Sequence, residues 1–213
     1  MNKRRVVITG IGTVNPIGNN KQEFFEGLQE GRNGAGLLTK FDTTEFDTKF
    51  GCEVKNFDPT VYIDKKSIRR MDPYTIFAVC SAKMAVDDAN IDLETINKER
   101  VGVVFGSGIG GMDTFEKQHD AFAKGGPKMI SPFFVPMMIS DIAAGQISIQ
   151  FGFKGPNYAT TSACATSSHA IADAFMLIQR GSADMMLTGG SEASLTRMSL
   201  GGFKIGRASC RER

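Results

Sequence analysis

The stretch from Tyr158 to Ser194, YATTSACATSSHAIADAFMLIQRGSADMMLTGGSEAS, decides how the chain folds. β-forming and small residues run from Tyr158 to Ser162, a helical pattern follows from about Ala165 to Arg180, and a buried-strand pattern covers Asp184 to Thr188. Strand, tight turn, helix and strand in this order predict a βαβ unit. Strand and helix patterns also alternate elsewhere in the chain, which favours the α/β class.

Cys164 lies where the first strand of this unit gives way to the helix. A helix N-terminus offers unpaired N–H groups and a partial positive charge, which favour a thiolate and can hold an oxyanion when that thiolate attacks a carbonyl. Its neighbours Ala163, Ala165, Ser167 and Ser168 are small enough to let a substrate approach. Position alone leaves two interpretations open, a nucleophile and an ordinary small buried cysteine.

The composition is ordinary for a soluble globular protein, with 213 residues, 41% hydrophobic and 23% charged. A net charge of +2 favours neither a nucleic acid nor a membrane surface as partner. No apolar run has the length of a membrane span, and Thr9, Gly10 and Gly12 interrupt the residues in which a signal peptide would need its apolar core. Four widely spaced cysteines form no metal or disulfide pattern, so we expect a cytoplasmic protein without a metal.

Further patterns predict the remaining elements. The expected strands are Arg5 to Thr9 and Val101 to Phe105. The first expected helix runs to about Glu30 with Asn19 or Asn20 as its cap, Asp72-Pro73 starts a second that runs to about Asn90, and two more cover Met112 to Lys124 and Asp141 to Gln150. Glycines follow both strands. However, the first pattern is G-x-G-x-x-x-P and the second lacks a Lys-Ser/Thr ending, which argues against dinucleotide and phosphate loops. Cys80 falls in an apolar helical stripe and is expected in the core.

Several motifs together resemble the β-ketoacyl-acyl carrier protein synthases of the condensing-enzyme, thiolase-like superfamily, and most closely the bacterial elongating synthase II branch. They are RRVVITGIGTVNPIG at 4–18, GSGIGG at 106–111, SPFFVP at 131–136, TTSACATSSHAI at 160–171 and GSADMMLTGGSEAS at 181–194. The resemblance runs from about Lys3 to Phe203. It implies a thiolase-like duplication of five αβαβα layers, of which this chain is the N-terminal half, and it implies that Cys164 carries the acyl chain as a thioester.

The resemblance also implies roles for other residues. The acyl pocket is expected to contain Ile109, Phe134 and Phe203, with SPFFVP at the interface of a homodimer. Docking of the acidic acyl carrier protein is expected to involve Lys65, Lys66, Arg69, Arg70 and Lys128. The first four recur at helical spacing and would form one basic ridge, although an ordinary solvated helix face is the alternative. No cofactor is implied.

The implied activity is fatty-acid elongation, in which malonyl-acyl carrier protein loses carbon dioxide and condenses with the acyl group on Cys164. Such synthases take two histidines and a lysine for this step from a second half. Here only His119, on a polar surface helix, and His169 are present. His169 follows Cys164 by five positions, which turns it by roughly 140° on the helix, so we expect structural packing and not a general base.

Two other readings stay open, and both concern the same fold. One is another condensing enzyme, a polyketide-type ketosynthase or a thiolase, and the other is a non-catalytic fragment that dimerises or binds carrier protein. We expect one truncated domain at 1–203 that is inactive alone. Residues 204–213 are expected to be a non-native tail, because IGRASCRER can be encoded by a sequencing adapter, and Cys210 then has no functional weight.

Overall fold

The computed structural model describes residues 4–203, so the expected tail at 204–213, with Cys210, lies outside the described residues. The centre of the fold is a parallel sheet with the strand order β4-β3-β5. A separate antiparallel pair of strands, β1-β2, lies in the early part of the chain. The strands are β1 Gly36–Leu37, β2 Phe50–Gly51, β3 Val101–Gly106, β4 Asn157–Tyr158 and β5 Met185–Gly190. The predicted βαβ unit is therefore present as β4, α7 and β5.

The helices confirm most of the sequence-based predictions. They are α1 Lys21–Gln29, α2 Lys65–Ile68, α3 Pro73–Asp88, α4 Met112–Gly125, α5 Phe134–Met138, α6 Ile142–Phe151, α7 Thr166–Gln179 and α8 Arg197–Gly202, with 3-10 turns η1 Pro59–Val61, η2 Lys98–Arg100, η3 Pro127–Met129 and η4 Ala163–Ala165. Asn20 and Asp72 cap α1 and α3 as their residue types predict, since their side chains accept from the N–H of Glu23 and Tyr74. Among residues 4–203, no helix combines the length and the apolar character that crossing a bilayer requires.

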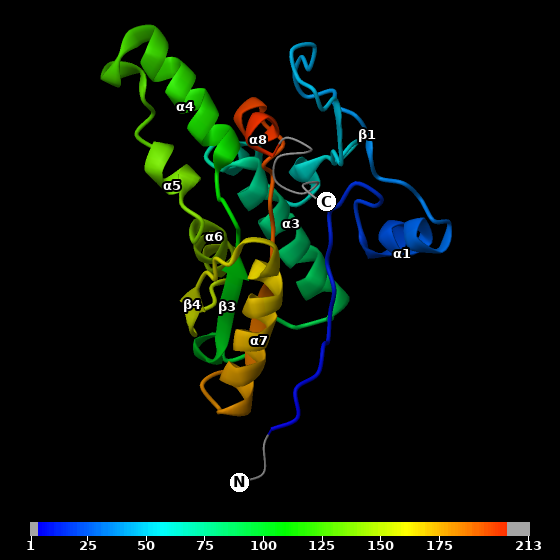
Figure 1. Cartoon of the computed structure of the whole chain (residues 1–213). Helices are drawn as coiled ribbons and strands as arrows, with labels where there is room; N and C mark the ends of the chain where they lie inside the picture. Colours follow the sequence, from blue (N-terminus) through cyan, green and yellow to red (C-terminus); the bar gives the residue numbers. More distant parts are fainter. Residues whose placement is uncertain (1–3, 204–213) are drawn as a thin grey trace, which may run out of the picture.

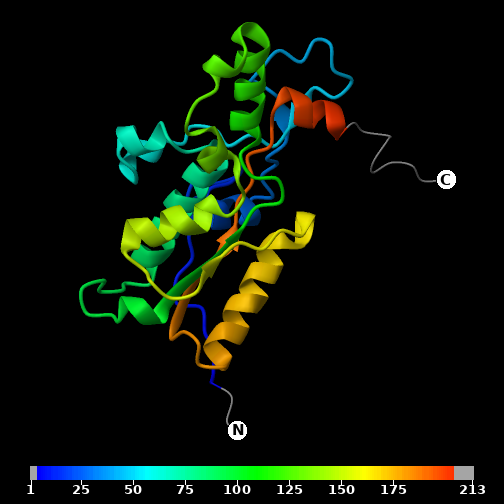
Figure 2. The same cartoon turned by 90° about the vertical axis from the view of Figure 1, so that its left-hand side faces the viewer.

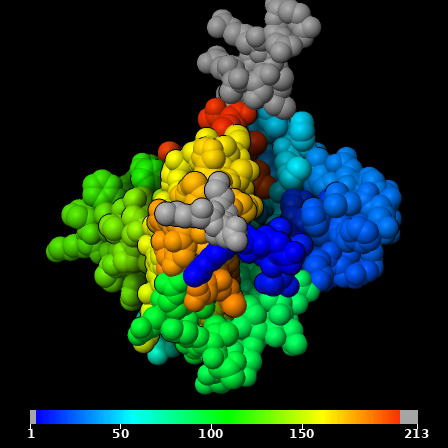
Figure 3. Space-filling model, turned by 90° about the horizontal axis from the view of Figure 1, so that it is seen from below, coloured from blue at the N-terminus to red at the C-terminus, as the bar shows by residue number. Residues whose placement is uncertain are grey.

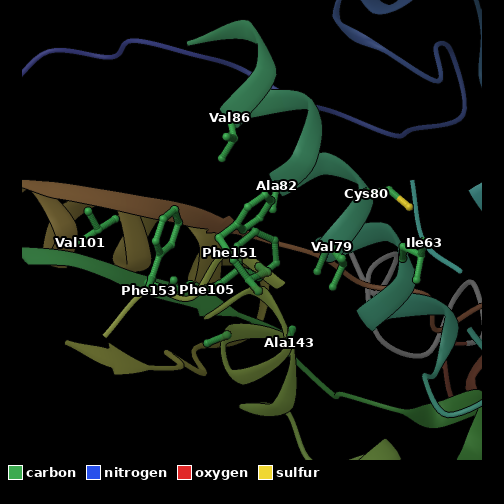
Figure 4. Close-up of a cluster of buried hydrophobic side chains, with 14 of the residues drawn as sticks. Ile63, Val79, Cys80, Ala82, Val86, Val101, Phe105, Ala143, Phe151 and Phe153 are labelled. Carbon is green, nitrogen blue, oxygen red and sulfur yellow. The ribbon is translucent and has the colours of Figure 1, made fainter. Parts of the chain in front are cut away.

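Helices cover both faces of the sheet, with α7 on one face and α6 backed by α3 on the other (Figures 1 and 2). Side chains of β3 alternate between these faces, as they must in a strand. Val101, Val103 and Phe105 join the large cluster with α3 and α6 (Figure 4), whereas Val104 packs against α7. Cys80 lies in the large cluster, as predicted, and burial raises the pKa of its thiol to about 12.

The buried strand predicted at Arg5 to Thr9 is wrong for this structure. Val7 is 60% and Ile8 is 81% exposed, and the segment forms no ladder with any described strand. Residues 6–14 and β5 line a common cavity of about 730 Å³, and the backbone of the segment pairs with neither edge strand of the β4-β3-β5 sheet. The segment lies at the surface, beside the C-terminal end of α7 (Figure 3). There Arg4 Nη1 forms an ion pair with Asp184 Oδ1 at 2.9 Å.

The glycines after that segment serve a close packing contact. A Cβ at Gly10 would lie 2.2 Å from the Ala85 carbonyl oxygen, and one at Gly12 would lie 1.9 Å from that of Ser81. Both carbonyls belong to α3, so only glycine lets the segment approach this helix. The glycines follow from this approach, and no bound phosphate is needed to account for them.

Candidate active site

Three loops leave the same edge of the sheet, at the carboxyl ends of β3, β4 and β5. They are residues 106–111, 159–162 and 191–194. Because β3 and β5 pair in parallel with Gly106 opposite Gly190, the loops that follow them start side by side. The crevice outside the carboxyl ends of parallel strands is where α/β proteins bind ligands.

Cys164 lies in this place, exposed, in the turn η4 directly before α7. Ala163, directly before it, has a φ of +50°. Residues other than glycine rarely adopt such a positive φ, so the turn is strained. Two hydrogen bonds hold the turn to the start of α7, from Ser162 N–H to Thr166 Oγ1 at 2.8 Å and from Thr160 Oγ1 to the Thr166 carbonyl at 2.9 Å. The thiol is thus presented at the N-terminus of a helix, as the sequence predicts.

Small residues let α7 begin close to the sheet. A Cβ at Gly106 would lie 2.3 Å from Thr166 Cγ2, and one at Gly190 would lie 2.9 Å from Ser167 Cβ. A larger residue at either strand end would push the first turn of α7, and Cys164 with it, away from the other two loops.

Glu192 links the loops, and the sequence analysis did not single it out. Its Oε2 accepts the N–H of Gly108 at 2.9 Å and that of Ile109 at 3.1 Å, and Ser107 Oγ donates to it at 3.3 Å. Its Oε1 accepts from Ser194 Oγ at 2.7 Å. An acidic residue two positions after the end of β5 was a signal that could have marked it.

The predicted acyl-pocket residues occupy three different elements. Ile109 is on the loop after β3, half exposed, and its neighbour Gly108 packs on Ala163. Phe134 is half-buried on α5, with its ring centroid 6.4 Å from that of Phe115 on α4. Phe203 ends α8 and is 67% exposed. The loop contact places Ile109 next to the Cys164 turn, whereas Phe134 lies on α5 and Phe203 at the end of α8.

The predicted basic residues are all exposed, but they do not form a ridge along one helix. α2 ends at Ile68, and Arg69 is its C-terminal cap. Asp72-Pro73 follows closely, and a residue before proline disfavours helical backbone, so the helix cannot continue. The Arg70 guanidinium lies 4.9 Å from the centre of the Phe133 ring, which turns this residue toward the segment between η3, where Lys128 lies, and α5.

The two histidines differ in their surroundings. His119 is exposed on α4, 3.6 Å from Asp120, as predicted. His169 was expected to pack structurally, but it is exposed, and its Nδ1 shares a hydrogen bond of 2.6 Å with Ser162 Oγ. The angle between Cys164 and His169 along the helix could not predict this contact, because Ser162 lies before the helix begins. His169 therefore belongs to the turn that carries Cys164. Within residues 4–203, no three His, Cys, Asp or Glu side chains converge as they would around a metal ion.

The fold and the exposed cysteine at the strand ends agree with the family comparison. A family model described as "Beta-ketoacyl synthase, N-terminal domain" matches residues 3–213, and the chain belongs to this family. Since the match runs to residue 213, the predicted domain boundary at 203 stays a prediction.

Individual proteins of known function and structure are similar to this chain over nearly its whole length. The chain is 46% identical over 208 residues to the 3-oxoacyl-[acyl-carrier-protein] synthase 2 of Synechocystis sp. and 48% identical over 205 residues to that of Staphylococcus aureus strain COL. These alignments cover 98% and 96% of the chain and 50% of each relative, so the chain spans about half the length of the curated relatives it matches. The solved structure of the ishigamide ketosynthase/chain length factor superposes with a TM-score of 0.87 at 28% identity, covering 95% of this chain and 50% of that one. This confirms the predicted thiolase-like α/β fold.

Proposed function

We propose that this chain supplies the acyl-carrying half of an enzyme that elongates fatty acids by decarboxylative condensation. The observation that carries the proposal is the Cys164 thiol, exposed on a strained turn at the start of a 14-residue helix and next to a glycine loop. Strained backbone and a helix N-terminus are features of sites that bind or react. The identity of 46–48% to 3-oxoacyl-[acyl-carrier-protein] synthases 2 supports the choice of reaction.

In the first step, the Cys164 thiolate attacks the carbonyl of an acyl thioester on the carrier. A C–S bond to Cys164 forms, the bond to the carrier sulfur breaks, and the carrier leaves as a thiolate that takes up a proton. The N-terminus of α7 can stabilise the oxyanion that develops on the carbonyl oxygen.

In the second step, a malonyl group on a second carrier loses carbon dioxide. The electron pair left on its α-carbon attacks the Cys164 thioester, and the cysteine leaves as a thiolate. The product is a β-ketoacyl carrier two carbons longer. Decarboxylation needs positioned donors for the enolate, and within the described residues the imidazoles available are the surface His119 and the Ser162-bonded His169. We therefore expect chain 1–213 alone to load an acyl group but not to condense.

The loading step can be tested with octanoyl-acyl carrier protein by following the release of the carrier thiol. We expect Cys164→Ala to abolish release, because it removes the exposed thiol at the N-terminus of α7 that forms the thioester. Cys52→Ala is the matched control, since Cys52 is also a free exposed cysteine, and this variant should load normally. Loss of release in the Cys52 variant alone would refute the proposal.

Carrier docking through Lys65, Lys66, Arg69, Arg70 and Lys128 is part of the same proposal, as are a homodimer and a cytoplasmic location. The positive residues around α2 suit an acidic partner. Lys65→Glu and Lys66→Glu, each made as a single variant, should raise the KM for octanoyl-carrier protein, and the effect should shrink at high salt. Lys154→Glu is the control, because Lys154 is exposed just before β4, at the opposite end of the sheet. An equal KM change in that variant would assign the effect to net charge.

A polyketide-type ketosynthase is the second candidate, because the ishigamide ketosynthase/chain length factor shares 28% identity over 95% of the chain. The higher identity to the curated synthases favours fatty-acid elongation. Loading rates with saturated octanoyl-carrier and with 3-oxooctanoyl-carrier separate the two, since a fatty-acid enzyme should prefer the fully reduced chain.

A further inference from the structure

A single carboxylate oxygen gathers three donors from the loop after β3. Two are the backbone N–H groups of Gly108 and Ile109, at 2.9 and 3.1 Å from Glu192 Oε2, and the third is the hydroxyl of Ser107 at 3.3 Å. Hydrogen bonds to an ionised acceptor are stronger than those between neutral groups. Glu192 and the loop lie 83 to 85 positions apart in sequence, so the carboxylate joins the end of β5 to the end of β3.

The loop held in this way lies beside the turn that carries Cys164. A Cβ built at Gly108 would lie 3.0 Å from Glu192 Oε2 and 3.6 Å from the Cα of Ala163. Gly108 is therefore enclosed between the carboxylate and the strained residue directly before Cys164, which has a φ of +50°.

Ser107 extends the same network inward. It is 1% exposed, its Oγ accepts the N–H of Gly110 at 2.9 Å, and its carbonyl accepts from Thr161 Oγ1 at 3.3 Å. Thr161 belongs to the segment between β4 and Cys164. The loop is thus fixed from both sides, by Glu192 at the end of β5 and by the approach to the cysteine at the end of β4.

We propose that Glu192 is a positioning residue that fixes the loop 107–109 against the Cys164 turn and so places Ile109 where an acyl chain enters the site. The proposal rests on the function proposed above. Glu192 touches neither the thiol nor the substrate in this account. It acts through the loop, because without the carboxylate the two amides turn to water and the loop leaves its place beside Ala163.

If the proposal holds, the transfer of a long acyl chain to Cys164 depends on Glu192 more strongly than the transfer of a short one. A long chain needs Ile109 in place, whereas an acetyl group or a small alkylating reagent needs only the thiol. In Glu192→Ala, we expect octanoyl transfer to Cys164 from octanoyl-N-acetylcysteamine to fall about tenfold or more, and amide exchange at Gly108 and Ile109 to rise by a similar factor, as the loss of charged hydrogen bonds implies. Acetyl transfer and alkylation of Cys164 by iodoacetamide should stay within about twofold, the range of surface substitutions.

Three further variants complete the test on chain 1–213. Glu192→Gln keeps one acceptor oxygen and should restore part of the octanoyl rate. Gly108→Ala keeps the Glu192 side chain but crowds its Oε2, which the added methyl would meet at 3.0 Å; the loop and the carboxylate must then move apart, and the variant should reproduce the selective loss. Glu94→Ala removes an exposed carboxylate whose side chain forms no hydrogen bond or ion pair within residues 4–203, and it should change nothing.

The outcomes separate this proposal from the function it rests on. Equal losses of octanoyl transfer, acetyl transfer and alkylation in Glu192→Ala, or unchanged octanoyl transfer and amide exchange, overturn the positioning role. A wild-type chain that accepts neither acyl group contradicts the proposed function, and amide exchange in the same variants then still decides whether Glu192 holds the loop. If Glu192→Ala does not fold, Gly108→Ala decides, and normal chain-length selectivity in that variant overturns the proposal.

Discussion

The two faces of the central sheet are covered very differently. On one face, α3 and α6 bury a large cluster in which Tyr74, Val79 and Ile147 are almost or fully inaccessible. On the other face, the buried cluster consists of Val104, Ala170 and Leu177 with Met186 packed against it, and much of α7 stays open. Ile171 and Phe175 on α7 are 52% and 43% exposed.

α7 therefore carries more apolar surface than the described residues cover. A helix that is apolar on several sides is typical of a position between two layers, as the predicted αβαβα arrangement requires. Exposed apolar patches of this kind mark surfaces that bind other protein. Cys164 begins this helix, so the proposed active site lies at the border between the closed face and the open one.

The closed face should show the largest effect on stability. Ile147→Ala should lower the free energy of unfolding by about 2–5 kcal/mol, because it leaves a cavity in the cluster under β3. Ile149 on the same helix is 75% exposed, and Ile149→Ala should change it by less than about 0.5 kcal/mol. Urea unfolding measures both, and similar losses in the two variants would mean that α6 does not pack as described.

The open face should show its effect on association and not on folding. We expect chain 1–213 to self-associate, and Ile171→Ser with Phe175→Ser to weaken this by about tenfold, because both remove exposed apolar area. Analytical ultracentrifugation measures the dissociation constant. Ile149→Ser is the control on the other side of the molecule, and an equal weakening there would contradict a special role for the α7 face.

The smallest effect concerns the open edge of the sheet, where Asp184 joins two arginines. Hydrogen bonds from Arg100, then Arg4, lower the pKa of the Asp184 carboxyl to about 2. The pKa of the Asp184 carboxyl in the folded chain lies below its usual value near 4. The contacts of Asp184 with the two arginines therefore add stability above pH 4, and this contribution is lost as pH falls through about 2. Wild type should therefore be more stable than Asp184→Asn at pH 7. The difference should shrink as pH falls toward 2 and vanish below it, and a difference that stays undiminished there would contradict this origin.

Local patterns predicted much of this fold. The capping residues Asn20 and Asp72, the apolar run of β3 and the helical period of α7 are all properties of neighbouring residues, and each produced the expected element. The exception was the apolar run at Arg5 to Thr9. Its sequence indicates a tendency to be buried, but a strand also needs a partner edge, which depends on distant parts of the chain.

The site was predicted unevenly for the same reason. Cys164 could be found from its junction and from motif resemblance, since both lie in one short stretch. Glu192 could not be tied to the loop 107–109, because more than 80 residues separate them and only the parallel pairing of β3 and β5 joins them. The basic ridge at Lys65 to Arg70 failed because helical spacing was extended beyond the single turn that α2 forms.

The central claim, that Cys164 is the residue that carries the acyl group, is tested most directly by peptide mapping. Chain 1–213 is incubated with octanoyl-acyl carrier protein, digested and analysed by mass spectrometry at a pH that preserves thioesters. We predict an octanoyl group on the peptide that contains Cys164, with Cys52 and Cys80 unmodified, because of these three cysteines of residues 4–203 it is Cys164 that combines exposure with a helix N-terminus. An octanoyl group on Cys52 instead, or none on Cys164 while iodoacetamide still labels it, would contradict the account.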